Sequence, residues 1–189
     1  GVQTCALPIL PTPLPSIGHL SLQTFSGADL ELLVQSPLSA FPNIHSLTLI
    51  GQHYIGPTFP TTPTSLTAAI TTLVLMTTTR EYSNNLRDHL LPLFSSVENL
   101  HLGYWGERID FLERVASLAT TRLRSLTLEW HCAEDHEILQ ALDMAVLGEL
   151  EYLKLNYYEG YDDVEQGSDE VRAKCRERGI ELVDRWWTE

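Results

Sequence analysis

The hydrophobic and polar positions of this chain follow a frame that returns at a nearly constant interval. The frame is an aliphatic residue, two variable residues, Leu, one variable residue and Leu, and it occurs six times. One further step of 27 residues falls on Ile180. A fixed period in this range is typical of solenoid proteins. The central leucines, which set steps of 27, 26, 27, 26 and 27 residues, are Leu20, Leu47, Leu73, Leu100, Leu126 and Leu153.

Each copy of the frame predicts one strand, because Leu-x-Leu alternates apolar and polar positions as a half-buried strand does. The first three strands are expected at residues 17–23, 44–50 and 70–76. The rest of each step has room for a turn, a helix and a return, which makes successive strands parallel neighbours. We therefore expect an α/β solenoid of about seven parallel strands with helices on its convex side.

Apolar residues at helical spacing predict helices in the connecting segments. The expected helices cover residues 26–35, 84–95, 107–118, 134–147 and 168–178. The fourth of these five ranges should turn inward Ile138, Leu139, Leu142, Ala145 and Val146. The last strand ends in two tryptophans at 186–187, which are suited to sealing the open end of the shared core.

The frame is that of a leucine-rich repeat, and the chain resembles the leucine-rich-repeat region of fungal F-box proteins. The resemblance rests on the six frames, on the link Phe-Pro-Asn-Ile at 41–44 and on the closing segment 173–182. It implies a ribonuclease-inhibitor-like horseshoe over residues 14–189. The chain departs from the family at the ladder position, which often holds Asn or Cys and here holds Phe25, Gln52, Thr78, Trp105, His131 and Tyr158.

Residues 1–9 resemble the translated read-through of a sequencing-library adapter. With that resemblance, residues 1–13 are interpreted as a non-native tail, and the sequence as a gene model truncated at its N-terminus. The alternative is an ordinary irregular tail. A native reading frame that continues through these codons in the transcript would decide for the alternative.

Composition and charge narrow the function classes. The net charge of −13 disfavours nucleic acid and anionic membrane surfaces as partners, and no apolar run approaches the ~20 residues of a membrane span. All basic residues lie from Arg80 onward. The cysteines Cys5, Cys132 and Cys175 form no close pair, which favours a reducing compartment. We expect a monomer in the cytoplasm or the nucleus.

The densest group of possible metal ligands is the segment 131–137, with two histidines, one cysteine and three acids. No second group has matching spacing, and Gln140 stands where a helical zinc motif beginning at His136 needs its second histidine. The sequence also lacks the glycine-rich and nucleophile motifs of common enzymes. We expect no metal, no cofactor and no catalytic residue. Cys175 is interpreted as a plain helix residue, and the alternative is that the basic helix around it lowers the pKa of its thiol.

The stronger signal for function lies on the predicted sheet, because solenoids of this type bind partners on the concave side. Aromatic residues stand two positions after the last leucine in three consecutive copies, with polar residues beside them. Such a combination is typical of interface hot spots, although aromatic rings that pack on one another at the rim of the core are the alternative. The predicted binding residues are Tyr104, Trp105, Trp130, Tyr157, Tyr158, His101, Glu129, Lys154 and Asn156.

These observations predict a protein–protein interaction domain without catalytic activity. The resemblance implies the substrate-recognition part of an F-box protein in a ubiquitin ligase. The ligase adaptor would be reached only through an F-box segment that this sequence does not contain. A free-standing leucine-rich-repeat scaffold without a ubiquitin link is the alternative, and the upstream coding sequence discriminates between the two.

Overall fold

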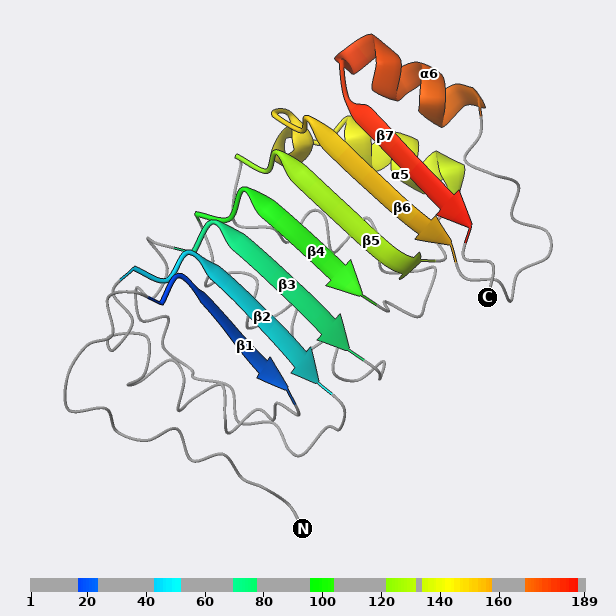
Figure 1. Cartoon of the computed structure of the whole chain (residues 1–189). Coiled ribbons are helices and arrows are strands. Elements are labelled where there is room, and N and C mark those ends of the chain that lie inside the picture. The colour runs from blue at the N-terminus through cyan, green and yellow to red at the C-terminus, as the bar shows by residue number, and fades with distance from the viewer. Residues whose placement is uncertain are drawn as a thin grey trace, which may run out of the picture.

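The computed structural model describes residues 17–23, 43–51, 70–77, 96–103, 122–131, 134–157 and 169–186. Within these residues the chain forms one parallel sheet, two α-helices and a short 3-10 helix (Figure 1). The strands are β1 (His19–Gln23), β2 (Ser46–Gly51), β3 (Thr72–Thr77), β4 (Asn99–Gly103), β5 (Ser125–His131), β6 (Tyr152–Tyr157) and β7 (Glu181–Trp186). The helices are α5 (Asp135–Leu142), the 3-10 helix η4 (Ala145–Leu147) and α6 (Asp169–Arg178).

The strands lie side by side in chain order, from β1 at one edge to β7 at the other. Every pairing is parallel, and the central leucines of the six frames fall in one register row across the sheet. The prediction of consecutive parallel strands is therefore confirmed. The row ends on Leu182, the register partner of Leu153, and not on the predicted Ile180. Ile180 lies before β7, and its amide donates to the carbonyl of Cys175 at the end of α6.

The start of each strand is held by one repeated backbone contact. The carbonyl of Gly18 accepts hydrogen bonds from two consecutive amides, those of His45 and Ser46. The same bifurcated arrangement recurs at the carbonyls of His45, Thr71, Glu98 and Arg124, with donor–acceptor distances of 2.8–3.0 Å. Because buried backbone groups need partners, this contact fixes each strand relative to its neighbour by main-chain atoms alone.

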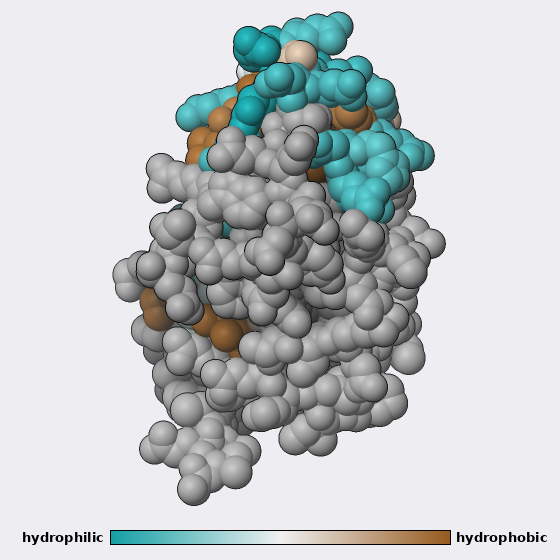
Figure 2. All heavy atoms as spheres, turned by 90° about the vertical axis from the view of Figure 1, so that its right-hand side faces the viewer, coloured by the Kyte–Doolittle hydropathy of each residue, from teal (hydrophilic) through white to brown (hydrophobic). Residues whose placement is uncertain are grey.

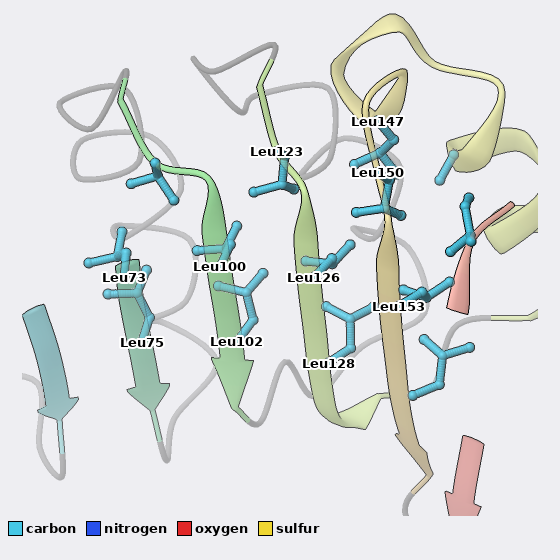
Figure 3. Packing of buried hydrophobic residues seen from close by; sticks show 14 of the residues in the cluster. Leu73, Leu75, Leu100, Leu102, Leu123, Leu126, Leu128, Leu147, Leu150 and Leu153 are labelled. Atoms are coloured by element: carbon cyan, nitrogen blue, oxygen red, sulfur yellow. The ribbon is translucent and has the colours of Figure 1, made fainter. Parts of the chain in front are cut away.

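The leucines of the frames form a single core on one face of the sheet (Figure 3). Leu73, Leu126 and Leu153 are at most 2% exposed, and the first aliphatic residue of each copy from Ile44 to Leu150 is buried beside them. Each such leucine stabilises the fold by roughly 2 kcal/mol through the apolar surface removed from water. No single copy of the frame encloses these side chains, so their burial depends on the neighbouring strands.

Helices α5 and α6 pack on the leucine face. Their buried residues Ile138, Ala141, Leu142, Val171 and Cys175 belong to the same core cluster. Together the two helices cover the leucine face at the β6 and β7 end of the sheet (Figure 1). The fold is therefore α/β, with a layer of helix on one side of the described sheet.

Helix α5 is shorter than the predicted range 134–147. It ends at Leu142, since Met144 has an extended backbone with φ −74° and ψ 142°, and η4 follows. The change of phase leaves Ala145 exposed and buries Leu147, so the expectation that Ala145 points inward was wrong. Asp143, a poor helix former, stands at the break, and its carboxylate lies 2.7 Å from Lys174 Nζ of α6.

The predicted helices at 26–35, 84–95 and 107–118 lie outside the described residues, as do the tail 1–13, Ser168 and Trp187. The side chain of Trp186 also lies outside them, so the tryptophan seal stays a prediction, and among the described side chains the β7 end carries a polar contact. Asp184 occupies the register position of Leu155, and its carboxylate binds Arg172 of α6. Figure 2 shows this end of the molecule, where the described surface is mainly hydrophilic with hydrophobic residues between the polar ones.

Candidate functional site

The face of the sheet opposite the leucines carries the residues that stand between the two leucines of each strand. We call it the outer face. Its central row runs across the sheet in register and consists of Ser21, Thr48, Val74, His101, Thr127, Lys154 and Val183. No helix among the described residues packs on it, because α5 and α6 both bury their apolar sides in the leucine core.

Two apolar side chains, those of Ile50 and Met76, lie side by side on the outer face of β2 and β3. Met76 of β3 lies against Gly103 of β4, so closely that a Cβ added at Gly103 would be 2.3 Å from the Met76 Sδ. The half-buried Ile50 is the register partner of Met76 on β2. The glycine therefore lets a long apolar side chain reach across from the neighbouring strand.

His101 of β4 and Glu129 of β5 form a polar contact on the same face. His101 Nε2 lies 3.0 Å from Glu129 Oε1, and the two side chains are 31% and 21% exposed. Although the distance is that of an ion pair, His101 Nε2 makes no hydrogen bond and is shielded from solvent. The carboxylate of Glu129 is thus partly shielded from water, and its ion-pair contact within the described residues is with an imidazole.

Asn156 lies on the other side of Glu129. It is the register partner of Glu129 on β6, and its side chain is 2% exposed. Its Oδ1 atom is buried and makes no hydrogen bond with the described residues. An unpaired buried polar atom of this kind costs roughly 1–3 kcal/mol of stability, so a native structure rarely keeps one without a reason.

These two orphan atoms flank the same carboxylate. Among the described residues, His101 Nε2 and Asn156 Oδ1 are the two buried side-chain polar atoms without a hydrogen bond, and they lie on the strands either side of β5. His101, Glu129, Lys154 and Asn156 were all predicted as binding residues, and the structure places all four on adjacent strands of the outer face. Lys154 is half-buried and stands two residues before Asn156 on the same face.

The aromatic part of the prediction is only partly within the described residues. Tyr104, Trp105 and Tyr158 lie outside them, and only the backbone is described at Trp130 and Tyr157. A register shift between Glu129 and His131 pairs Tyr157 with His131, so Trp130 is the extra residue of a β-bulge. On β7 the register partner of Tyr157 is Trp186. Bulges redirect a strand at its end, which changes the simple row of adjacent aromatics that the repeat spacing predicts.

Of the candidate metal ligands at 131–137, the structure describes the side chains from Glu134 to Glu137. His136 Nδ1 lies 3.2 Å from Glu134 Oε2 at the exposed start of α5, and Glu137 accepts a hydrogen bond from the Glu134 amide, as in a helix cap. Within the described residues no three His, Cys, Asp or Glu side chains gather as metal ligands. Cys132 lies outside that part of the chain.

Cys175 is a core residue and not an activated thiol. Its side chain is 1% exposed. Burial raises the pKa of the Cys175 thiol, and the nearby Arg178 opposes this effect only in part. The alternative interpretation of a basic helix that lowers the thiol pKa is therefore overturned.

None of the helices in the described ranges combines the length and the apolar character needed to cross a lipid bilayer. Comparison of the chain with protein-family models gave no match. No curated protein matches it, and no solved structure matches it. The assignment of the candidate site therefore depends on the geometry of this chain alone.

The sequence pointed to the four polar residues but not to their burial. Period-two alternation places His101, Glu129 and Asn156 on one face and is silent on which of them solvent reaches. The contact of Met76 with Gly103 was also missed. A glycine inside a strand pattern is a signal of close approach by a neighbouring group, and Gly103 is such a glycine.

Proposed function

We propose that this chain is a leucine-rich-repeat domain that binds a protein partner on the outer face of its sheet and has no catalytic role. The observation that supports the proposal most is that the two faces of the sheet differ in their side chains and in their packing. On one face the described leucines of β2 to β6 form a core shared by successive strands, and the other face carries half-buried polar side chains and two buried polar atoms without a hydrogen bond among the described residues. Repeat proteins with this arrangement use the second face for recognition.

The identity of the repeats as leucine-rich repeats rests on their sequence frame. The parallel sheet with strands in chain order and helices on one face is compatible with such a solenoid. We further propose that the domain is the substrate-recognition part of an F-box protein, located in the cytoplasm or the nucleus. This step depends on the resemblance of the repeats alone.

Affinity capture with the intact chain tests the binding proposal. Thr127 lies at the centre of the outer face between His101 and Lys154 in register, so Thr127→Arg places a bulky charge in the middle of the proposed interface. Arg176→Glu on the exposed side of α6 is the matched control, because it changes charge on the opposite layer. We expect at least one captured protein to be lost with Thr127→Arg and retained with Arg176→Glu.

The variants must first be shown to fold, by circular dichroism and by an unchanged urea midpoint. Within the same experiment, Trp130→Ala and Tyr157→Ala are expected to weaken capture without unfolding the domain. If every captured protein is insensitive to all three outer-face changes, the binding proposal is wrong.

The ubiquitin link needs a separate experiment. Sequencing of the transcript upstream of residue 10 should recover a short helical F-box segment, and the longer product should bind the ligase adaptor directly. An upstream reading frame without such a segment, or a product that does not bind the adaptor, would favour the free-standing scaffold instead.

A further inference from the structure

The two outermost strands of the described sheet, β1 and β7, hold different residues at the positions that face the leucine core (Figure 1). In β1 these positions are Leu20 and Leu22. In β7 they are Leu182 and Asp184, of which Asp184 is the register partner of Leu155. The second leucine of the frame is at most 5% exposed in each strand from β2 to β6. The β7 edge therefore carries a charge where each of these strands buries a leucine.

The backbone of β7 is suited to pairing on the side that faces away from β6. The amide of Glu181 donates to the carbonyl of Glu151, so Glu181 is turned toward β6. Because successive residues of a strand direct their N–H and C=O groups to opposite sides, those of Leu182 and Asp184 point away from β6. The register of β7 with β6 runs without a shift over all six residues of β7. The backbone geometry thus permits a further parallel strand, and the side chains decide whether one is added.

We propose that Asp184, held by Arg172, prevents a second copy of this chain from adding its strand β1 to the edge of β7. An added strand would cover Asp184 in the way that β7 covers Leu155. Arg172 and Asp184 are joined over 2.9 Å, and their side chains are still 37% and 21% exposed. Removal of the remaining water from such a pair costs free energy that the attraction between the two charges does not return in full. Charged residues that point inward on an edge strand are one of the ways in which sheets avoid pairing with other chains.

The edge of β1 is the matching partner because it belongs to the same repeat pattern. Gly18 precedes β1, and its carbonyl binds the start of β2, whereas Ile180 holds the equivalent position before β7. The β1 strand of a second copy could therefore continue the sheet in register, with Leu20 beside Leu182. Both of these leucines are half-buried, whereas the leucines between them in the same row are at most 2% exposed. Head-to-tail contacts of this kind join more than two copies, in a ring or in an open filament.

Sedimentation velocity of the intact chain over a wide range of protein concentration tests the inference. We expect the unchanged chain to remain a monomer. Asp184→Leu restores the second leucine of the frame and should shift the chain to species larger than a dimer, in a fraction that grows with concentration. Asp184→Val is the second variant and should associate in the same way.

Two single variants separate this explanation from a general loss of stability or gain of hydrophobic surface. Arg172→Met breaks the same ion pair but leaves the charge of Asp184 in place, so this variant should stay a monomer. Glu181→Leu adds an exposed leucine to β7 on the opposite face and should also stay a monomer. Circular dichroism and a cooperative urea transition establish that each variant is folded.

A proline at position 21 tests whether β1 is the strand that is added. Ser21 is exposed, and its N–H points away from β2, because the carbonyl of Gly18 and by alternation that of Leu20 face β2. Ser21→Pro removes a donor from this edge without removing a hydrogen bond from the sheet. In the Asp184→Leu background, Ser21→Pro should return the chain to a monomer.

Four results would overturn the inference. The first is a folded Asp184→Leu chain that associates no more than the unchanged chain, and the second is equal association of Arg172→Met or Glu181→Leu. The third is association of Asp184→Leu that Ser21→Pro leaves unchanged. The fourth is failure of both Asp184→Leu and Asp184→Val to fold, since the charge would then be required for the fold itself. The inference concerns the edge of the sheet and not its outer face, so it and the proposed function can fail independently.

Discussion

Arg172 on α6 and Asp184 on β7 are joined by a hydrogen-bonded ion pair, in which Arg172 Nη2 donates to Asp184 Oδ2 over 2.9 Å. Asp184 holds the register position that Leu155 holds on β6. A charge is tolerated there because β7 is the outermost strand of the described sheet and both side chains keep some contact with water, at 37% and 21% exposure. Among the described side chains, the β7 end of the core thus carries a polar contact.

The pair predicts a measurable coupling between helix and strand. Arg172→Met and Asp184→Asn are each expected to lower the free energy of unfolding, and the double variant should lose less than their sum. A double-mutant cycle in urea should give a coupling of about 0.5–1 kcal/mol, since both groups are partly hydrated and screened. A coupling indistinguishable from zero would mean that the contact does not seal this end.

The hydrogen bonds of Arg178, at the junction of successive repeats, predict a larger effect on the free energy of unfolding than the Arg172–Asp184 pair does. Its guanidinium donates to the carbonyl oxygen of Leu142 at the end of α5, and over 2.6 Å to that of Leu147 at the end of η4. Helix ends leave such carbonyls unsatisfied, and α5 has no basic residue in its last turn. Arg178→Lys should destabilise the fold by about 1–2 kcal/mol, because an ammonium cannot reproduce the fork.

Arg176→Lys is the matched control for this measurement. Arg176 is exposed on the same helix, and its Nε donates to the carbonyl of Arg172 in the preceding turn. Its replacement should change the free energy of unfolding by less than about 0.5 kcal/mol. Equal losses for the two variants would show that Arg178 does not link the repeats.

The close contact between Gly103 and Met76 predicts that Gly103→Ala destabilises the fold and that Met76→Ala removes this loss. In Gly103→Ala the new Cβ would meet the Met76 Sδ at 2.3 Å, so the flexible methionine must move. We expect a loss of roughly 1 kcal/mol in the free energy of unfolding. Because Met76→Ala removes the obstructing atoms, Gly103→Ala should be close to neutral in that background. A loss that persists in the double variant would place the cause in the backbone instead.

Cys175 predicts slow alkylation and a loss of stability at alkaline pH. Burial raises its pKa in the folded chain above its ordinary value in the unfolded chain, so its contribution to stability is complete below the unfolded pKa and is lost as pH rises through the folded pKa. Iodoacetamide at about pH 8.5 should modify the Cys175 peptide far more slowly in the native chain than in urea, as mass spectrometry can measure. Similar rates in both states would contradict its burial.

The repeat frame was sufficient to predict the sheet. Leucine in the same two positions of every copy admits one solution in which all are buried, namely parallel strands in chain order and in register. The frame failed only at its end. There the 27-residue step pointed to Ile180, whereas α6 and its Gly179 turn, with φ 71°, delay the register position to Leu182.

The sequence was sufficient to predict which residues share the candidate site, but not their burial or their hydrogen bonds. Alternation along a strand assigns His101, Glu129 and Asn156 to one face, because side chains point to opposite faces in turn. Burial at Asn156 and the missing hydrogen bonds depend on what neighbouring strands place beside it, which no local pattern encodes. The bulge at Trp130 is of the same kind, since it appears only when β5 is paired with β6.

The account depends on leucines from successive copies of the frame meeting as lateral neighbours in one core. Methyl NOE spectroscopy on the intact chain with labelled leucines measures this directly. We predict cross-peaks for the register pairs Leu73–Leu100, Leu100–Leu126 and Leu126–Leu153, and none between strands as distant as those of Leu47 and Leu153. Absent cross-peaks within the register pairs, or a direct contact between Leu47 and Leu153, would contradict the sheet and the outer face built on it.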